Sequence, residues 1–497
     1  MRKLLRAFAG AGIAAAMVVL TGPAASAAVD TNRQPQVLIG VGSDTTYELM
    51  NDLDQVYNES PGCAIIPTSG TFTNFGQKCL TPGTLSYAIN YSDLIETENL
   101  YHDMVTEAAP VGSGNGTTVL TESLKGTAGA TLGADFNRRS SSTTTSTIGT
   151  APYDFKLYET GYALDGLGVW VGKNNTLVYT GGTTTAKPTF LKNDLLNVWE
   201  PDGASSCFVK WSNVNGDSIG TLKVATTAFT DSNGDGIKDK NGGNIVLYAT
   251  QAGSGTGNSF DAFIRGVAQS SGVAANLQGC IPPQFKNGVL GDGEHVIFEN
   301  IANPICAAKT ATGALVNDRA KAIFPYSIGR FTQNAGSTAG PCLGVLGKLD
   351  TDSNVGTATD RIAATAANVS NGSYAYTRTV FNYWPVPVCK VINDQGTPGD
   401  KTDDTCTTTY AAAGFGINSP STWDQLPDRF EAILEYLHPT LGWLCKDNAD
   451  HSNSPVTSQN YATIIKSTTE ADGFGRLSSA PVGGSTFSGS SFCRSNS

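Results

Sequence analysis

Residues 245–265 have the pattern of a buried strand that runs through a glycine-rich turn directly into a helix. Residues 245–249 are apolar and rich in β-branched side chains, which predicts the strand. Apolar residues then recur at helical spacing and predict a helix over 259–269: Phe260, Phe263, Ile264 and Val267. The turn Gly253-Ser254-Gly255-Thr256-Gly257 would present backbone N–H groups, hydroxyls and the positive end of the helix dipole, which together favour an oxyanion.

A second unit of the same kind lies near the start of the chain. Residues 37–41 predict a strand, Gly42-Ser43-Asp44-Thr45-Thr46 a turn, and residues 46–58 a helix. Either turn alone is also explained as an ordinary helix cap, because Ser and Asp are favoured at that position. Two such units, far apart in sequence, can instead close on one ligand from two sides.

The N-terminus predicts a secretory signal over residues 1–27. A basic start precedes an apolar stretch over 7–20 and the small residues Ala25-Ser26-Ala27. That stretch is too short for a confident membrane span, and no cysteine follows it closely for a lipid anchor. We therefore expect a secreted, extracellular protein with no membrane insertion.

The charge excludes some partners. Removal of the signal changes the net charge from -11 to -14, because three basic residues and no acidic ones are lost. A chain this acidic is a poor candidate for nucleic acid, whose binding depends on Lys and Arg. An anionic ligand would have to be held by local dipoles and one or two arginines against the overall field.

The 10 cysteines form an even set, which in an exported chain predicts five disulfides. Short separations favour three pairs, while leaving the connectivity open: Cys63–Cys79, Cys280–Cys306 and Cys389–Cys406. No cysteine or histidine cluster has the spacing of a zinc site.

The length favours two lobes, and alternating strand and helix patterns favour α/β layers with largely parallel sheets. Further strands are expected at residues 164–171 and 380–391, and further helices at 191–199 and 429–437.

Several segments, in order, resemble the phosphate-binding proteins of ABC importers. They are the opening turn 40–46, residues 135–141, the strand 163–169, residues 190–199 with Trp211, the Ser-Gly-Thr turn, and a closing stretch from Tyr383-Trp384-Pro385-Val386 to residues 471–477. The resemblance implies the two-lobed α/β fold of the type II periplasmic-binding-protein-like superfamily, with a ligand cleft between lobes. It implies lobe I at residues 28–165 plus 385–497 and lobe II at 166–384.

The resemblance also implies the residues that contact the oxyanion. They are Ser43, Asp44, Thr45 and Thr46 of the first turn, Arg138, Arg139, Ser140 and Ser141 of the middle segment, and Gly253, Ser254, Gly255 and Thr256 of the second turn. Thr250 stands where the family often has an arginine, so Arg138 or Arg139 would have to supply the guanidinium. Arg138 and Arg139 could equally be a solvated pair on a polar loop. No acidic residue directly precedes the second turn, so oxyanion binding is better supported than phosphate selectivity.

A separate loop predicts structural calcium, the only bound ion or cofactor we expect. Oxygen ligands alternate along it at Asp231, Asn233, Asp235 and Asp239, although Gly242 occupies the position where a calcium loop carries its last acidic ligand. A polar hairpin explains the same residues.

The sequence thus predicts a monomeric, non-enzymatic solute-binding protein for a small oxyanion, with inorganic phosphate as the first choice and an ABC permease as a partner. The four histidines are scattered, and no nucleophile elbow occurs. The alternative is a secreted protein of the same fold without a transport role, either an extracellular interaction protein or a phosphohydrolase.

Overall fold

The computed structural model describes residues 36–58, 103–125, 133–142, 147–150, 153–171, 177–179, 189–201, 206–208, 211–214, 222–224, 245–251, 254–266, 277, 279–281, 295–297, 305, 322–335, 345–350, 362–393, 405–409, 426–439, 442–445, 461–477 and 493–495. The signal, the calcium loop, Gly253 and the Cys63–Cys79 pair lie outside these residues.

The first strand-turn-helix unit forms as predicted. Strand β1 spans Val37–Gly42 and helix α2 spans Tyr47–Asn58. Leu49, Met50 and Leu53 form the buried stripe of α2. Gly42 has φ 117°, and a Cβ there would overlap Asn137 Oδ1, so both the backbone conformation and the close approach require glycine.

The second unit forms with different boundaries. The strand predicted at 245–249 is two short strands, β9 (Val246–Leu247) and β10 (Ala249–Thr250), which join different sheets. The break falls at Tyr248, whose N–H donates to Ile323 O and whose carbonyl accepts from Trp199 Nε1.

Helix α6 spans Gly255–Arg265, so it begins and ends four residues before the predicted helix over 259–269. Ser254 is its N-cap, with its hydroxyl oxygen accepting from Gly257 N at 3.0 Å. The cap allows the helix to start on residues of poor helix propensity. Gly266, at φ 72°, ends it in the left-handed conformation.

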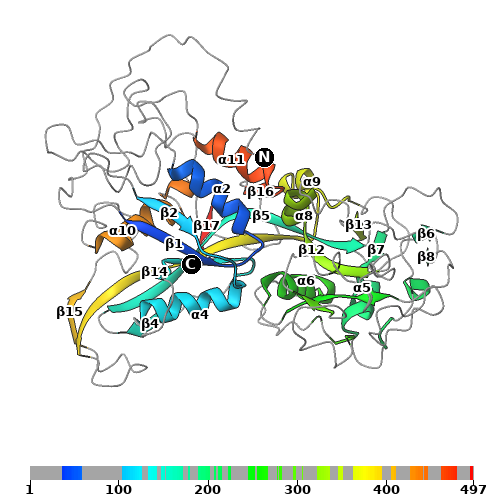
Figure 1. Ribbon diagram of the computed structural model, residues 1–497, viewed down its shortest axis with the longest axis horizontal. Helices are drawn as coiled ribbons and strands as arrows, with labels where there is room; N and C mark the ends of the chain where they lie inside the picture. Colours follow the sequence, from blue (N-terminus) through cyan, green and yellow to red (C-terminus); the bar gives the residue numbers. More distant parts are fainter. Residues whose placement is uncertain are drawn as a thin grey trace, which may run out of the picture.

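Two long strands pair in the middle of the molecule, and only the first of them continues across it (Figure 1). Strand β5 (Tyr153–Val171) and strand β14 (Thr377–Asn393) extend beyond the predicted ranges and pair antiparallel. Three further strands join them in the main sheet: β2 (Met104–Glu107), β3 (Phe136–Arg139) and β12 (Ala322–Ser327). The order is β2-β1-β3-β14-β5-β12-β9, with parallel pairs at both ends and antiparallel pairs in the middle. The prediction of largely parallel sheets was therefore wrong, because the two crossover strands run in opposite directions.

The protein is a two-lobed α/β molecule with two main hydrophobic cores. The first core contains Leu38, Leu53 and Ile433, and the second contains Trp199, Phe260 and Phe324. The elements around them are called the first and second lobe below.

Strand β5 passes from the first core to the second between Ala163 and Leu164. The chain returns between Tyr376, in the second core, and Val380, in the first. Each lobe therefore has its own core, and the strands β5 and β14 connect the two.

The remaining elements complete the two lobes. In the first lobe they are α4 (Ser113–Leu124), β4 (Thr147–Thr150), β15 (Thr405–Thr409), α10 (Asp428–Leu437), η8 (Trp443–Cys445), α11 (Tyr461–Ala471), β16 (Gly475–Arg476) and β17 (Arg494–Ser495). In the second they are β6 (Leu177–Tyr179), β7 (Thr189–Leu191), α5 (Lys192–Trp199), η1 (Trp211–Asn213), β8 (Leu222–Val224), β11 (Val296–Ile297), α8 (Ile328–Ala335), β13 (Val345–Asp350) and α9 (Ala366–Ser370).

The disulfides correct one predicted pair. Cys280 bonds Cys207 across 73 residues, so the Cys280–Cys306 pair was wrong. Cys445 bonds Cys493 across 48 residues, and Cys389 is also disulfide-bonded. Sequence separation was a poor guide to this pair, because the fold places Cys280 next to the end of α5, where its N–H donates to Trp199 O. Cys207 lies at the same end of α5 and pairs with Cys280.

Within the described part of the chain, no helix has the length and hydropathy needed to cross a membrane.

Candidate functional site

The first turn is buried where β1 gives way to α2. Ser43, Asp44, Thr45 and Thr46 are all at most 5% exposed. Ser43 Oγ accepts from Thr45 N at 3.2 Å, and Ser43 N donates to Arg138 O at 3.0 Å. The carbonyl of Thr46 accepts from Met50 N in the first turn of α2. These bonds hold the turn so that the Thr45 side chain faces away from the first lobe, toward α6.

The second turn is equally buried at the start of α6. Ser254 and Thr256 are at most 1% exposed. A Cβ on Gly255 would overlap Ser140 Oγ and lie 2.8 Å from Ser113 Oγ, so the start of α6 is pressed against the first lobe at this point.

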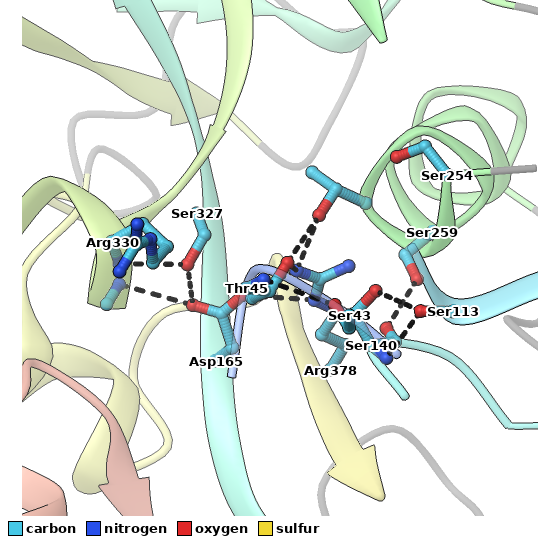
Figure 2. A network of polar contacts seen from close by, with 12 residues as sticks. Ser43, Thr45, Ser113, Ser140, Asp165, Ser254, Ser259, Ser327, Arg330 and Arg378 are labelled. Carbon is cyan, nitrogen blue, oxygen red and sulfur yellow. Dashed lines mark hydrogen bonds and ion pairs between the residues drawn. The ribbon is translucent and has the colours of Figure 1, made fainter. Parts of the chain in front are cut away.

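The two turns meet directly. Thr45 Oγ1 and Thr256 Oγ1 lie 3.0 Å apart, although the residues are 211 positions apart in the sequence. Figure 2 shows Thr45 in the middle of a polar network, with Asp165 and Ser327 on one side and Ser113, Ser140, Ser254 and Ser259 on the other. The residues predicted from two separate turns are therefore brought to one place.

Serines from three segments of the chain form a second contact between the lobes. Ser113 Oγ lies 3.1 Å from Ser140 Oγ and accepts from Ser140 N at 3.1 Å. Ser259 of α6 donates to Ser140 O at 3.3 Å. The sequence interpretation missed Ser113 and Ser259. The run Gly112-Ser113-Gly114 was a usable signal for Ser113, because it is another glycine-serine opening of a helix, α4.

Arg138 is engaged within the first lobe. It forms an ion pair with Glu107, and its Nε and Nη2 donate to the carbonyls of Ser43 and Ala108. Burial lowers its pKa to about 10, while nearby Tyr162, Asp54, Tyr47 and Asp44 oppose that fall. Through its bond to Ser43, Arg138 holds the first turn in place from within the first lobe.

Arg139 is engaged in a similar way. Its Nε donates to Ser141 O at 3.1 Å, its Nη1 bonds Thr117 Oγ1, and its guanidinium lies 5.8 Å from the ring centre of Tyr383. Arg138 and Arg139 are both buried, so they are not the solvated loop pair that the sequence left open. The described bonds of these two arginines lie away from the Thr45–Thr256 contact.

The arginine at that contact is Arg378, which the sequence interpretation missed. Its Nη2 donates to Thr256 Oγ1 at 2.9 Å and lies 3.5 Å from Thr45 Oγ1. Its Nε and Nη2 both donate to Asp165 Oδ2, at 3.0 and 2.7 Å. Arg378 lies two residues before the strand predicted at 380–391, between Thr377 and Thr379, and no pattern there marked it as part of a site.

Asp165 is held on both sides. Its Oδ1 accepts from Ser327 Oγ at 2.7 Å and from Gly329 N at 3.3 Å, where α8 begins. Burial raises the pKa of Asp165, and Arg378, Ser327 and Gly329 oppose that rise.

The two buried histidines, His295 and His438, make their described contacts away from Thr45 and Thr256. His295 stacks on Tyr248, and burial lowers the pKa of His438, at the end of α10, to about 4. Across the described residues, no group of three or more Asp, Glu, His or Cys could hold a metal ion. The predicted calcium ligands Asp231, Asn233, Asp235 and Asp239 lie outside that part of the chain.

Comparisons with known proteins give weak structural likenesses. No protein-family model matches the chain, and no curated protein does. Similar solved structures include an ABC-type phosphate transport receptor from Vibrio cholerae, at 15% identity and a TM-score of 0.33, covering 70% of this chain and 87% of that one. PstS from Borrelia burgdorferi has 12% identity and a TM-score of 0.28, covering 70% and 87%. The periplasmic phosphate-binding protein PfluDING, bound with phosphate, has 13% identity and a TM-score of 0.38, covering 87% and 93%. Likenesses of this size do not show that the chain shares a ligand with these proteins.

Proposed function

We propose that this protein binds a small oxyanion between its two lobes, with inorganic phosphate as the first choice, and that it is a solute-binding protein and not an enzyme. The observation that carries the proposal is the meeting of the Thr45 and Thr256 hydroxyls, each at the opening of a helix from a different lobe. The openings of α2 and α6 add backbone N–H groups and the positive ends of two helix dipoles. The whole arrangement suits a ligand that accepts hydrogen bonds and carries negative charge.

Binding would exchange one hydrogen bond for several. The anion would take the place of the direct Thr45–Thr256 bond, so the two turns would separate slightly and each hydroxyl would donate to an anion oxygen. The crossover strands β5 and β14 would carry this movement, because they connect two lobes with separate cores.

Export and a transport role are part of the proposal. The disulfides Cys207–Cys280 and Cys445–Cys493 support an oxidising compartment, because such bonds are rare where thiols are kept reduced. We propose cleavage of residues 1–27, a monomer, and delivery of the ligand to an ABC permease.

Calorimetric titration tests the proposal. Mature protein, freed of ligand by unfolding and refolding, is titrated with phosphate, sulfate, arsenate and small organic anions. Thr45→Val and Thr256→Val should each weaken binding by about 1.5–3 kcal/mol, the usual value of a hydrogen bond to a charged group. Thr469→Val is the matched control, because this equally buried hydroxyl bonds only a carbonyl within α11.

Absence of heat from every anion, with folded protein, would overturn the proposal and leave an extracellular interaction protein or a phosphohydrolase. If Thr45→Val, Thr256→Val and Thr469→Val all bound the anion with equal affinity, the binding site would have to lie away from the two turns.

A further inference from the structure

We infer that Arg378 is the cationic anchor of the oxyanion site and that Asp165 holds its guanidinium in place. This inference rests on the proposed function and adds to it the residue that supplies the positive charge. Neither residue belongs to the turns or to the middle segment from which the site was predicted.

The position of the pair in the fold is the first argument. Asp165 on β5 and Arg378 on β14 are direct partners in the antiparallel register. Asp165 directly follows Leu164, the first residue of β5 in the second core, and Arg378 lies between Tyr376 of the second core and Val380 of the first. A side chain at this point can reach the N-terminus of α2 in the first lobe and the N-terminus of α6 in the second. Arg378 does so, because its Nη2 lies within 3.5 Å of Thr45 Oγ1 and Thr256 Oγ1.

The donors of Arg378 are the second argument. A guanidinium has five N–H donors. One on Nε and one on Nη2 go to Asp165 Oδ2, and the other on Nη2 goes to Thr256 Oγ1. Nη1, which carries the remaining two, is buried and has no hydrogen-bond partner among the described residues. Since the group is planar and Asp165 occupies its Nε–Nη2 edge, Nη1 lies beside the nitrogen that contacts the two threonines.

A purely structural ion pair explains the Asp165 contacts but not this arrangement. Leaving two buried N–H donors unsatisfied costs free energy. An anion oxygen near the threonines would satisfy them, and a planar fork of donors matches a tetrahedral oxyanion.

The surroundings of Asp165 are the third argument. Its second oxygen is held by Ser327 Oγ and Gly329 N, so the carboxylate is bonded on both sides. A carboxylate fixed in this way limits rotation of the Arg378 side chain, and the guanidinium is therefore in place before a ligand arrives. The ion pair also reduces the cost of burying Arg378, whose side chain is 0% exposed.

The test measures phosphate affinity by calorimetry for Arg378→Lys, Arg378→Gln and the double variant Asp165→Asn/Arg378→Gln. Lysine keeps the charge and can keep the Asp165 pair, but it loses Nη1. We expect Arg378→Lys to weaken phosphate binding by about 10-fold or more, and both glutamine variants by about 100-fold or more. The matched control is Asp261→Asn/Arg265→Gln, which removes an ion pair at the far end of α6 and should leave affinity within about threefold.

Each outcome separates the inference from the proposed function. If the wild type binds phosphate and Arg378→Lys binds equally well, the inference is overturned while the function stands. If the folded wild type binds no oxyanion, both are overturned. Folding of every variant is checked by circular dichroism. Should the glutamine variants fail to fold, Arg378→Lys decides, with phosphate-dependent thermal stabilisation as its second measurement.

Discussion

At the scale of single residues, the site depends on how closely the two lobes approach. Gly255 shows this most directly, because any side chain there would overlap Ser140 Oγ of the first lobe. Thr256 is the next residue in α6, so displacement at Gly255 would also move the hydroxyl that meets Thr45.

We therefore expect Gly255→Ala to weaken oxyanion binding by about 10-fold or more, because the added methyl group would push the start of α6 away from the first lobe. Gly133→Ala is the control, since the nearest atom to its new methyl group would be Arg429 Nη2 at an ordinary 3.5 Å. Titration of both variants with phosphate checks the expectation. Equal affinities would mean that the close approach at Gly255 does not matter for binding.

At the scale of elements, helix α8 bonds Asp165 at its N-terminus and lies near the carboxyl group of Asp472 further along. Its N-terminus donates to Asp165 through Gly329 N. Further along α8, Gln333 lies near Asp472, whose carboxyl group interacts with that of Asp52 in α2. Burial raises the pKa of Asp472 to about 8, and the nearby carboxylates Asp52 and Glu48 add to the rise while Gln333 opposes it. Asp472 is therefore largely protonated at neutral pH.

This raised pKa predicts a pH dependence of stability. Between the ordinary value of 3.8 and about 8, the folded protein holds a proton on Asp472 that the unfolded chain has lost. The contribution is complete below pH 3.8 and is lost as pH rises through about 8, with a slope of at most about 1.4 kcal/mol per pH unit for one proton.

Asp472→Asn should flatten this part of the stability curve, because an amide cannot lose the proton. The measurement is denaturant unfolding at several pH values, with Glu470→Gln, a half-exposed position near the end of α11, as the control. A slope in Asp472→Asn equal to that of the wild type would contradict the assignment.

At the scale of the whole molecule, the disulfides stabilise different lobes. Cys445–Cys493 brings the C-terminal strand β17 to the first core, and Cys207–Cys280 closes a loop beside α5 in the second lobe. Each lobe has its own core, so loosening of one need not unfold the other.

Removal of Cys445–Cys493 by alanine at both positions should destabilise the first lobe by about 4 kcal/mol, from the entropy of the loop that the bond closes. Hydrogen exchange measured by mass spectrometry should then become faster in peptides of α2 and α10 than in those of α6. The double variant Cys207→Ala/Cys280→Ala should give the opposite pattern. Identical patterns in the two variants would show that the lobes unfold as one unit.

The sequence by itself determined the local units of this protein. Strand β1 and helices α2, α5 and α10 lie within a residue or so of their predicted ranges, because apolar periodicity and turn chemistry act over a few neighbouring positions. The hydroxyls of both turns could be named for the same reason. The start of α6 was missed because its first residues, Gly255 and Gly257, have poor helix propensity and depend on the Ser254 cap.

Only the tertiary structure decided which of these units meet. Arg378 finds Asp165 across 213 positions and Thr256 across 122, and Cys280 pairs with Cys207 instead of the nearer Cys306. Such contacts follow from strand register and from the packing of separate cores, which local propensity does not encode. The sequence supplied the two threonine hydroxyls, while the antiparallel pairing of β5 with β14 brought an arginine next to both of them.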